Sequence, residues 1–122
     1  MNLVAAALLA AQPVDCDDAL AQQDMNRCAA ASAREADAEL NRVYPQVVRQ
    51  MQRYDRDAET GGEAERRLRE AQRAWIAFRD AQCSLAGVEA LGGSLEPLLV
   101  SGCIKDLTER RISELQMMLL DR

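Results

Sequence analysis

Hydrophobic residues recur every three or four positions along most of this chain, which is the spacing of amphipathic helices. Over residues 19–58 the apolar positions at this spacing are Met25, Cys28, Ala36, Leu40, Val43, Val47, Met51 and Tyr54. Pro45 lies inside this run, and an interior proline removes a backbone hydrogen bond and clashes with the preceding turn. The pattern therefore predicts one long helix with a kink near residues 41–44.

Two more helices are predicted beyond a glycine pair at residues 61–62. Thr60 followed by Glu63 fits a capping box, which begins a helix over residues 62–85. One stripe of this helix holds Leu68, Ala71, Trp75, Phe78 and Gln82, and the adjoining stripe holds Gln72, Ile76, Arg79 and Cys83. Pro97 suits the first turn of a third helix, over residues 98–120. Its inward positions are Ile104, Leu107, Ile112, Leu115 and Met118.

The composition agrees with a helical fold. Strong helix formers such as Ala, Leu, Arg, Glu, Gln and Met dominate, whereas aromatic residues make up only 3% of the chain. A chain of 122 residues forms one domain at most. We therefore expect an all-α fold, a small antiparallel three-helix bundle with a kinked long first helix, held by two disulfides.

The four cysteines, Cys16, Cys28, Cys83 and Cys103, are an even number in a small chain, which is typical of exported disulfide-bonded domains. Three connectivities are open, and we favour the two local bridges, Cys16–Cys28 and Cys83–Cys103. No Cys-x-x-Cys motif is present, and a zinc site would need all four thiolates at unusual spacings. We expect neither a metal nor a cofactor.

The first residues resemble a secretory leader. An apolar run over residues 3–11 ends in two alanines that fit a cleavage site, although no basic residue precedes it. This predicts a signal peptide over residues 1–11, a domain over 12–122, and a periplasmic or secreted location; the alternative is a buried N-terminal helix. The run is too short to span a membrane as a mature helix, and Asp15 beside Cys16 argues against a lipid anchor.

Charge and side-chain chemistry limit the function. The net charge is −5, which disfavours nucleic acid as a partner and favours a cationic protein. The chain has no histidine, which excludes Ser-His-Asp and Cys-His catalysis within it. Paired carboxylates are present, but on helices they are typical of solvated faces. We expect no catalytic residues and no enzyme.

Four stretches together resemble one family. They are QQDMNRCA, EADAELNRVY, LREAQRAWIAFRDAQC and GGSLEPLLVSGCIKDLTERRISEL, which lie within residues 16–115 in this order. In order, spacing and cysteines they resemble the lysozyme inhibitor LprI family. The resemblance implies a helical, disulfide-bonded, exported domain, and a lysozyme as its partner.

Most residues of the resemblance are interpreted as structural. They are Asp37, Leu40, Asn41, Tyr44, Gln72, Trp75, Arg79, Asp80, Thr108 and Arg111. With so few aromatic residues, Trp75 and Phe78 are predicted to lie in the core. Arg79 borders the apolar stripe and is predicted to pair with Asp37 of the first helix. Arg79 and Asp80 are adjacent and therefore point about 100° apart, so we expect them not to share a face.

The glycine-rich loop over residues 87–97 is the candidate inhibitory segment. It carries Glu89, Gly93, Ser94 and Glu96, and a Cys83–Cys103 bridge would hold its base. A preorganised loop enters a cleft at lower entropic cost. This suggests non-covalent occlusion of a lysozyme. The alternatives are a plain helix connection and a periplasmic interaction module with another client.

Overall fold

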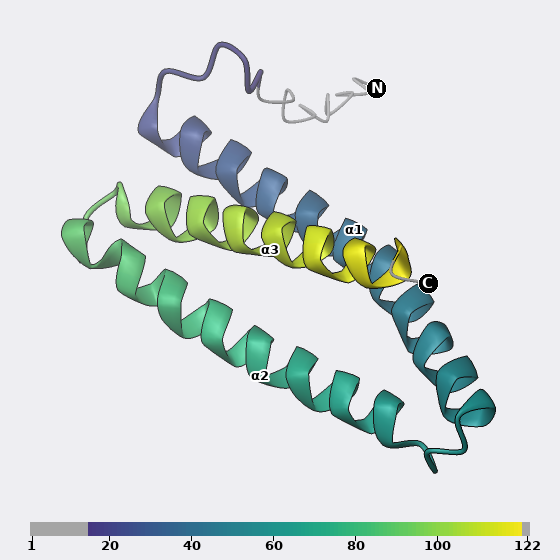
Figure 1. The fold of residues 1–122 in the computed structure, drawn as a ribbon. Coiled ribbons are helices and arrows are strands. Elements are labelled where there is room, and N and C mark those ends of the chain that lie inside the picture. Colours follow the sequence, from purple (N-terminus) through teal and green to yellow (C-terminus); the bar gives the residue numbers. More distant parts are fainter. Residues whose placement is uncertain (1–14, 121–122) are drawn as a thin grey trace, which may run out of the picture.

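Three long helices account for most of the computed structural model, which describes residues 15–120. They are α1 (Gln22–Asp57), α2 (Glu63–Ala86) and α3 (Glu96–Leu120), and a 3-10 helix, η1 (Gly87–Ala90), follows α2. Consecutive helices run in opposite directions, so α3 returns alongside α1 in the same direction (Figure 1). The prediction of a small helical bundle is confirmed. The predicted leader, residues 1–11, lies outside the described residues.

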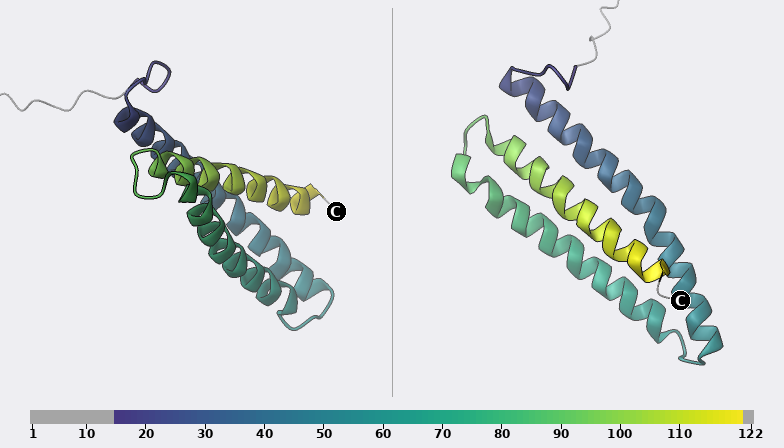
Figure 2. Two further views of the ribbon diagram at one scale, coloured as in Figure 1. Left: turned by 90° about the vertical axis from the view of Figure 1, so that its left-hand side faces the viewer. Right: turned by 45° about the horizontal axis from the view of Figure 1, so that its top comes forward.

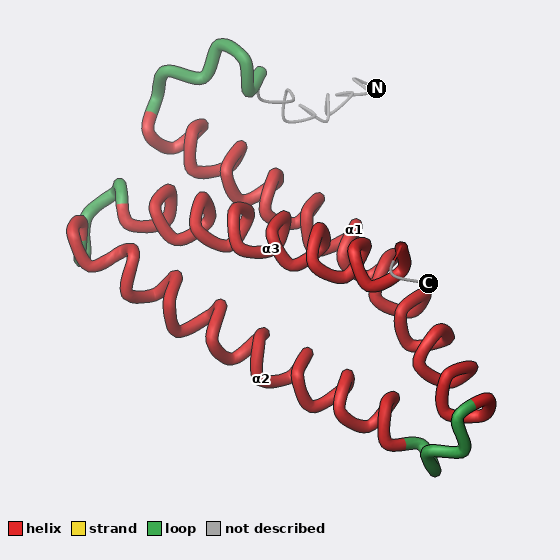
Figure 3. Tube along the Cα trace, in the orientation of Figure 1, coloured by secondary structure: helices red, strands yellow, loops and turns green. Residues whose placement is uncertain are grey.

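The predicted helix boundaries agree with the structure to within about three residues. Helix α3 begins at Glu96 rather than at residue 98, so Pro97 lies in its first turn as predicted. Figure 3 shows that non-helical chain in the described part is confined to the segment before α1 and the two connections. The second connection was predicted as a plain loop, and the structure instead shows that it begins with η1.

Helix α1 continues through Pro45 as a single element. The missing proline N–H leaves the Asn41 carbonyl without its helical donor. Asn41 and Pro45 are both exposed, so water can reach this carbonyl. The helix bends near its middle in the views of Figures 1 and 2, which agrees with the kink predicted there.

The core lies chiefly between α1 and α3, which pack against each other more extensively than either packs against α2. Its buried residues are Leu40, Val43, Val47 and Val48 of α1, Leu68 of α2, and Ile112 and Leu115 of α3. Trp75 and Met118 are among the partly buried residues around this cluster. Helix α2 contributes one residue to the cluster, and its apolar residues Ile76, Phe78 and Leu85 are exposed.

Two aromatic residues predicted to face inward lie at the surface. Phe78 is 56% exposed and Tyr54 is 52% exposed, so their predicted core positions are wrong. The buried positions of α2 are Leu68, Gln72, Arg79 and Cys83, which lie mainly on the adjoining stripe. Gln72 and Arg79 are buried because both find hydrogen-bond partners on other helices. Hydrophobicity alone therefore predicts an inward face of α2 that is rotated about the helix axis from the observed inward face.

The turn between α1 and α2 is organised by Asp55 rather than by a capping box. Its carboxylate accepts hydrogen bonds from the Thr60 hydroxyl and from the backbone N–H groups of Ala64, at 2.9 Å, and Glu65, at 3.0 Å. The Thr60 hydroxyl is the main reason that the pKa of Asp55 lies below its ordinary value of 3.8, and the two backbone donors lower it further. The predicted Thr60–Glu63 box is wrong because Asp55 engages the Thr60 hydroxyl and the free N–H groups at the start of α2.

Both predicted disulfides are present. Cys16 and Cys28, whose Cα atoms are 5.6 Å apart, tie the segment before α1 to that helix. Cys83 and Cys103, whose Cα atoms are 5.3 Å apart, join the end of α2 to α3. The second bridge therefore encloses η1 and the loop that follows it.

Candidate functional site

A polar cluster centred on Arg79 connects the three helices. The Arg79 Nη1 donates to Oδ1 of Asp37 on α1, at 2.7 Å, and to the hydroxyl of Thr108 on α3, at 3.2 Å. The predicted Arg79–Asp37 pair is thereby confirmed. Thr108 is fully buried, so its hydroxyl needs such a partner.

Asp80 belongs to the same cluster, contrary to the sequence-based expectation. The Arg79 Nε lies 3.0 Å from Asp80 Oδ1, although the two residues are neighbours in α2. The expectation considered only the directions in which the side chains leave the helix. The long arginine side chain turns its guanidinium back toward the neighbouring carboxylate, so adjacent residues form an ion pair.

Trp75 lies against two guanidinium groups. The Cζ atoms of Arg79 and Arg111 lie 5.2 Å and 5.9 Å from the centroid of the indole ring, which is within cation–π range. Arg111 also donates to Gln72 Oε1 at 3.0 Å and pairs with Glu114 at 2.9 Å. The contacts of Arg111 with Trp75 and Gln72 hold α2 against α3 through polar and aromatic groups, in addition to the aliphatic contacts of Leu68.

The segment that follows Cys83 is firmly positioned. Gly87 is buried at the start of η1, and a Cβ placed there would come within 2.8 Å of Val100 Cγ2 on α3. The backbone N–H of Gly92, which has a φ of +76°, donates to Glu96 Oε2 at 2.6 Å. Asn26 of α1 donates its side-chain amide to the Ser94 carbonyl at 2.8 Å. The loop is therefore attached to α1 and α3 as well as to the end of α2.

Four aliphatic side chains at this end of the molecule face solvent. Leu85, Val88, Leu91 and Leu95 are all exposed, and Leu91 is 75% exposed. Glu89 lies among them and is also exposed. Only glycine and polar residues of this loop were predicted as site residues. Leucine and valine recur in this stretch although it has no helical face that packs into the core. This recurrence is the sequence signal that indicates an exposed apolar surface.

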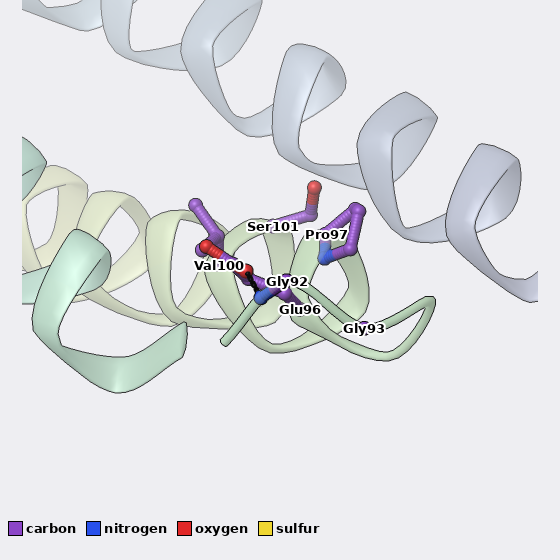
Figure 4. Close-up of a pocket in the computed structure, with 6 residues that line it drawn as sticks. All are labelled: Gly92, Gly93, Glu96, Pro97, Val100 and Ser101. Carbon is purple, nitrogen blue, oxygen red and sulfur yellow. Dashed lines mark hydrogen bonds between the residues drawn. The ribbon is translucent and has the colours of Figure 1, made fainter. Parts of the chain in front are cut away.

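A shallow depression lies at the junction of the loop and α3. It has a volume of about 430 Å³ and is lined by Gly92, Gly93, Glu96, Pro97, Val100 and Ser101. Figure 4 shows these residues, with the Gly92–Glu96 hydrogen bond across the turn. Among the described residues, no group of three or more metal-ligating side chains occurs, and no helix is long and apolar enough to cross a membrane.

Comparison with known proteins identifies the family. The model of a family described as lysozyme inhibitor LprI matches residues 16–115, a range that includes both disulfides and most of the three helices. The chain belongs to the LprI lysozyme inhibitor family. This confirms the resemblance found in the sequence.

A second comparison finds a similar protein. An uncharacterized protein of Rhizobium meliloti (strain 1021) is 52% identical over 107 residues, which cover 84% of this chain and 76% of the relative. No solved structure matches this LprI-family chain significantly.

The residues that carry the LprI resemblance gather in one region. A groove of about 330 Å³ between α1 and α2 is lined by Asp37, Leu40, Asn41, Tyr44, Gln72, Ile76 and Arg79. Asp37, Gln72 and Arg79 are committed to the interhelical cluster described above, which agrees with a structural role. Asn41 is exposed, and its side chain makes no hydrogen bond within the described part of the chain. A structural role of Asn41 through a hydrogen bond between helices is therefore not observed.

Proposed function

We propose that this protein is an exported inhibitor that blocks a lysozyme by non-covalent occlusion of its cleft. Membership of the LprI family supports a lysozyme as the partner. The two disulfides support an oxidising compartment, such as the periplasm or the extracellular space. The acidic net charge of −5 supports attraction to a cationic enzyme.

The observation that carries the proposal is the constrained, exposed loop over residues 87–97. A disulfide encloses it, and hydrogen bonds from Asn26 and to Glu96 fix its backbone. Since little conformational freedom remains to be lost on binding, the loop can enter a concave site at a low entropic cost. Its exposed apolar residues, such as Leu91, are suited to contact the substrate cleft of a lysozyme. The nearby Glu89 carboxylate is suited to contact cationic residues at the rim of that cleft.

The candidate loop residues divide into two groups in this proposal. Glu96 and the Ser94 carbonyl are used in hydrogen bonds that shape the loop, and Gly93 donates its N–H to Ala90 at 2.8 Å. The side chains of Glu89, Leu91 and Leu95 are exposed and take no part in these hydrogen bonds. We therefore assign the contacts with the enzyme to Glu89, Leu91 and Leu95, and the shape of the loop to Gly93, Ser94 and Glu96.

The alternative function is a periplasmic interaction module whose client is not a lysozyme. The exposed apolar side chains of α2, which include Phe78, favour a protein partner at a surface outside the loop. A turbidity assay on bacterial cell walls distinguishes the two functions. Inhibition of at least one lysozyme type by micromolar oxidised protein supports the first, whereas no inhibition across several types supports the second.

Export is tested separately from inhibition. The proposal expects the mature protein, recovered from the periplasm or the medium of its host, to begin near residue 12 and to contain no free thiol. Intact-mass measurement before and after reduction checks both points. A cytoplasmic protein that retains Met1 and has four reduced cysteines would contradict the proposal.

A further inference from the structure

An apolar stripe on the exposed side of α2 has no partner within the described structure. It consists of Ala71, Ala74, Phe78, Ala81 and Leu85, followed by Val88 at the start of η1, and all six residues are exposed. We call this set the α2 stripe. Its three large side chains, Phe78, Leu85 and Val88, are each more than half exposed. The exposed positions of α1, by contrast, are mostly charged or amide residues.

The spacing of the α2 stripe is that of a helix–helix seam. Its members follow one another at steps of three, four, three, four and three residues. Such a repeat keeps one narrow line of side chains facing a second helix along its whole length. Within residues 15–120 no other helix covers that line, because α1 and α3 contact the opposite side of α2 through Leu68, Gln72 and Arg79.

We propose that the α2 stripe is an interface at which two copies of this chain pair through antiparallel α2 helices. The order of side-chain sizes along the α2 stripe favours this pairing. The small residues Ala71 and Ala74 lie at one end, and the large residues Leu85 and Val88 lie at the other. An antiparallel pair centred between Phe78 and Ala81 therefore places one large and one small side chain in every layer.

This register gives three kinds of layer, and each kind occurs twice in the dimer. Ala71 meets Val88 of the second copy, Ala74 meets Leu85, and Phe78 meets Ala81. Small residues opposite large ones let the two helices interdigitate without voids or overlap. In a parallel pair, Phe78 would face Phe78 of the second copy and Ala74 would face Ala74. Crowded layers would then alternate with layers that leave gaps.

Charges at the two ends of the α2 stripe favour the same orientation. Arg67 precedes Ala71 at the same spacing and is exposed, and Glu89 follows Val88 and is also exposed. The antiparallel register brings Arg67 of each copy close to Glu89 of the other, at both ends. A parallel register would place arginine beside arginine and glutamate beside glutamate.

The size of the seam indicates how strong the pairing is. At a rise of 1.5 Å per residue, the α2 stripe is roughly 25 Å long. A pair of single helices buries less than a standard interface of about 1,600 Å². We therefore expect a reversible dimer that forms at high protein concentration. The inference does not depend on lysozyme inhibition. The antiparallel arrangement places the two loops at opposite ends of the dimer, where Val88 and Glu89, at the start of each loop, lie within the seam.

Sedimentation equilibrium of the oxidised protein, over a concentration series that reaches millimolar, tests this proposal. The wild-type protein should approach twice the monomer mass. Leu85→Glu should weaken dimerisation at least tenfold, because it places a carboxylate in the seam. Met117→Glu is the matched control, since Met117 is 57% exposed on α3 and lies outside the α2 stripe. This control should dimerise like the wild type.

A swap of side-chain size tests the register itself. Ala74→Leu should weaken the dimer by crowding the layer that contains Leu85. Combining Ala74→Leu with Leu85→Ala should restore it, because each layer again holds one large and one small side chain. Circular dichroism melting of every variant shows that the monomer still folds. A wild-type protein that stays monomeric throughout, a dimer insensitive to Leu85→Glu, or a failed rescue would each overturn the proposal.

Discussion

At the scale of single residues, Arg79 does most to attach α2 to the rest of the bundle. Its guanidinium contacts carboxylates on two helices and the buried Thr108 hydroxyl on a third, and it lies over the Trp75 ring. Few aliphatic side chains of α2 reach the core, so these polar contacts contribute a larger share of the interactions that hold α2 in the bundle. The position of α2 should therefore be sensitive to this one residue.

The first prediction concerns Arg79→Ala. Removing the guanidinium leaves the Thr108 hydroxyl unpaired in the interior and uncovers one face of Trp75. Asp37 is half exposed and can be hydrated again, so we expect a loss of about 2 kcal/mol rather than the larger cost of a fully buried pair. Thermal melting should show a fall in Tm of roughly 10 °C.

The matched control for this variant is Arg42→Ala. Arg42 pairs with Glu39 on the exposed side of α1, where both side chains are hydrated. Exposed pairs contribute little to stability, so its Tm should stay near the wild-type value. Equal effects of the two substitutions would contradict the role given to Arg79.

The second prediction concerns pH and Asp55. Its pKa is lowered in the folded protein, so its contribution to stability is complete above the unfolded value and is lost as pH falls through the folded value. The stability difference between the wild type and Asp55→Asn should therefore be constant near neutral pH and shrink below about pH 4. Urea unfolding at a series of pH values measures this difference. Asp57→Asn, at an exposed position two residues away, is the control for the loss of one charge. A stability difference between the wild type and Asp55→Asn that grows in acid would contradict this account of Asp55.

At the scale of elements, the connection after α2 shows why the site could be predicted only in part. Gly87, Gly92 and Pro97 marked a turn, and the cysteines marked a bridge across it. The η1 helix was not predicted because four residues of 3-10 helix have no periodicity to detect. The hydrogen bond from the Asn26 side chain to the Ser94 carbonyl was also not predictable from the sequence, since it joins residues that are 68 positions apart.

The helices themselves were predictable because local periodicity determines them. The bundle, the helix boundaries, both disulfides and the Arg79–Asp37 pair all followed from spacing and chemistry. The inward face of α2 did not, because Gln72 and Arg79 are polar and yet buried, whereas Phe78 is apolar and yet exposed. Which face a helix buries depends on partners on other helices, and those partners appear only in three dimensions.

The third prediction compares two glycines near α3. Gly87→Ala places a methyl group within 2.8 Å of Val100 Cγ2, so either the Val100 side chain or η1 must shift and the protein should be destabilised. Gly102→Ala lies within α3, where a Cβ meets nothing within 4 Å, and it should stabilise the protein by about 0.5–1 kcal/mol. Chemical denaturation of both variants measures these changes. Shifts of the same sign would contradict the close packing of η1.

At the scale of the whole molecule, a small core is supplemented by covalent and polar links. The aliphatic core joins α1 and α3, the Arg79 cluster adds α2, and the Cys83–Cys103 bridge closes the end where the loop lies. This arrangement leaves one end of the bundle held by a disulfide and hydrogen bonds and apolar at its surface. The same end is the one that the proposed function uses.

The fourth prediction concerns the Cys83–Cys103 bridge. Replacing both cysteines by serine should lower the free energy of unfolding by about 3 kcal/mol, because the unfolded chain regains the entropy of a closed segment of 20 residues. Inhibition should fall as well, since the loop loses its preorganisation. Denaturant unfolding and the turbidity assay measure the two effects. A double variant with unchanged stability and unchanged inhibition would contradict the role given to this bridge.

The central claim, that the loop over residues 87–97 occludes a lysozyme, is tested most directly by one comparison of inhibition constants. Leu91→Asp changes the most exposed leucine of the loop, and Met117→Asp makes the same kind of change on α3. Both variants should fold like the wild type. The account predicts that Leu91→Asp weakens inhibition at least tenfold while Met117→Asp inhibits like the wild type. Undiminished inhibition by Leu91→Asp, against a lysozyme that the wild type inhibits, would contradict it.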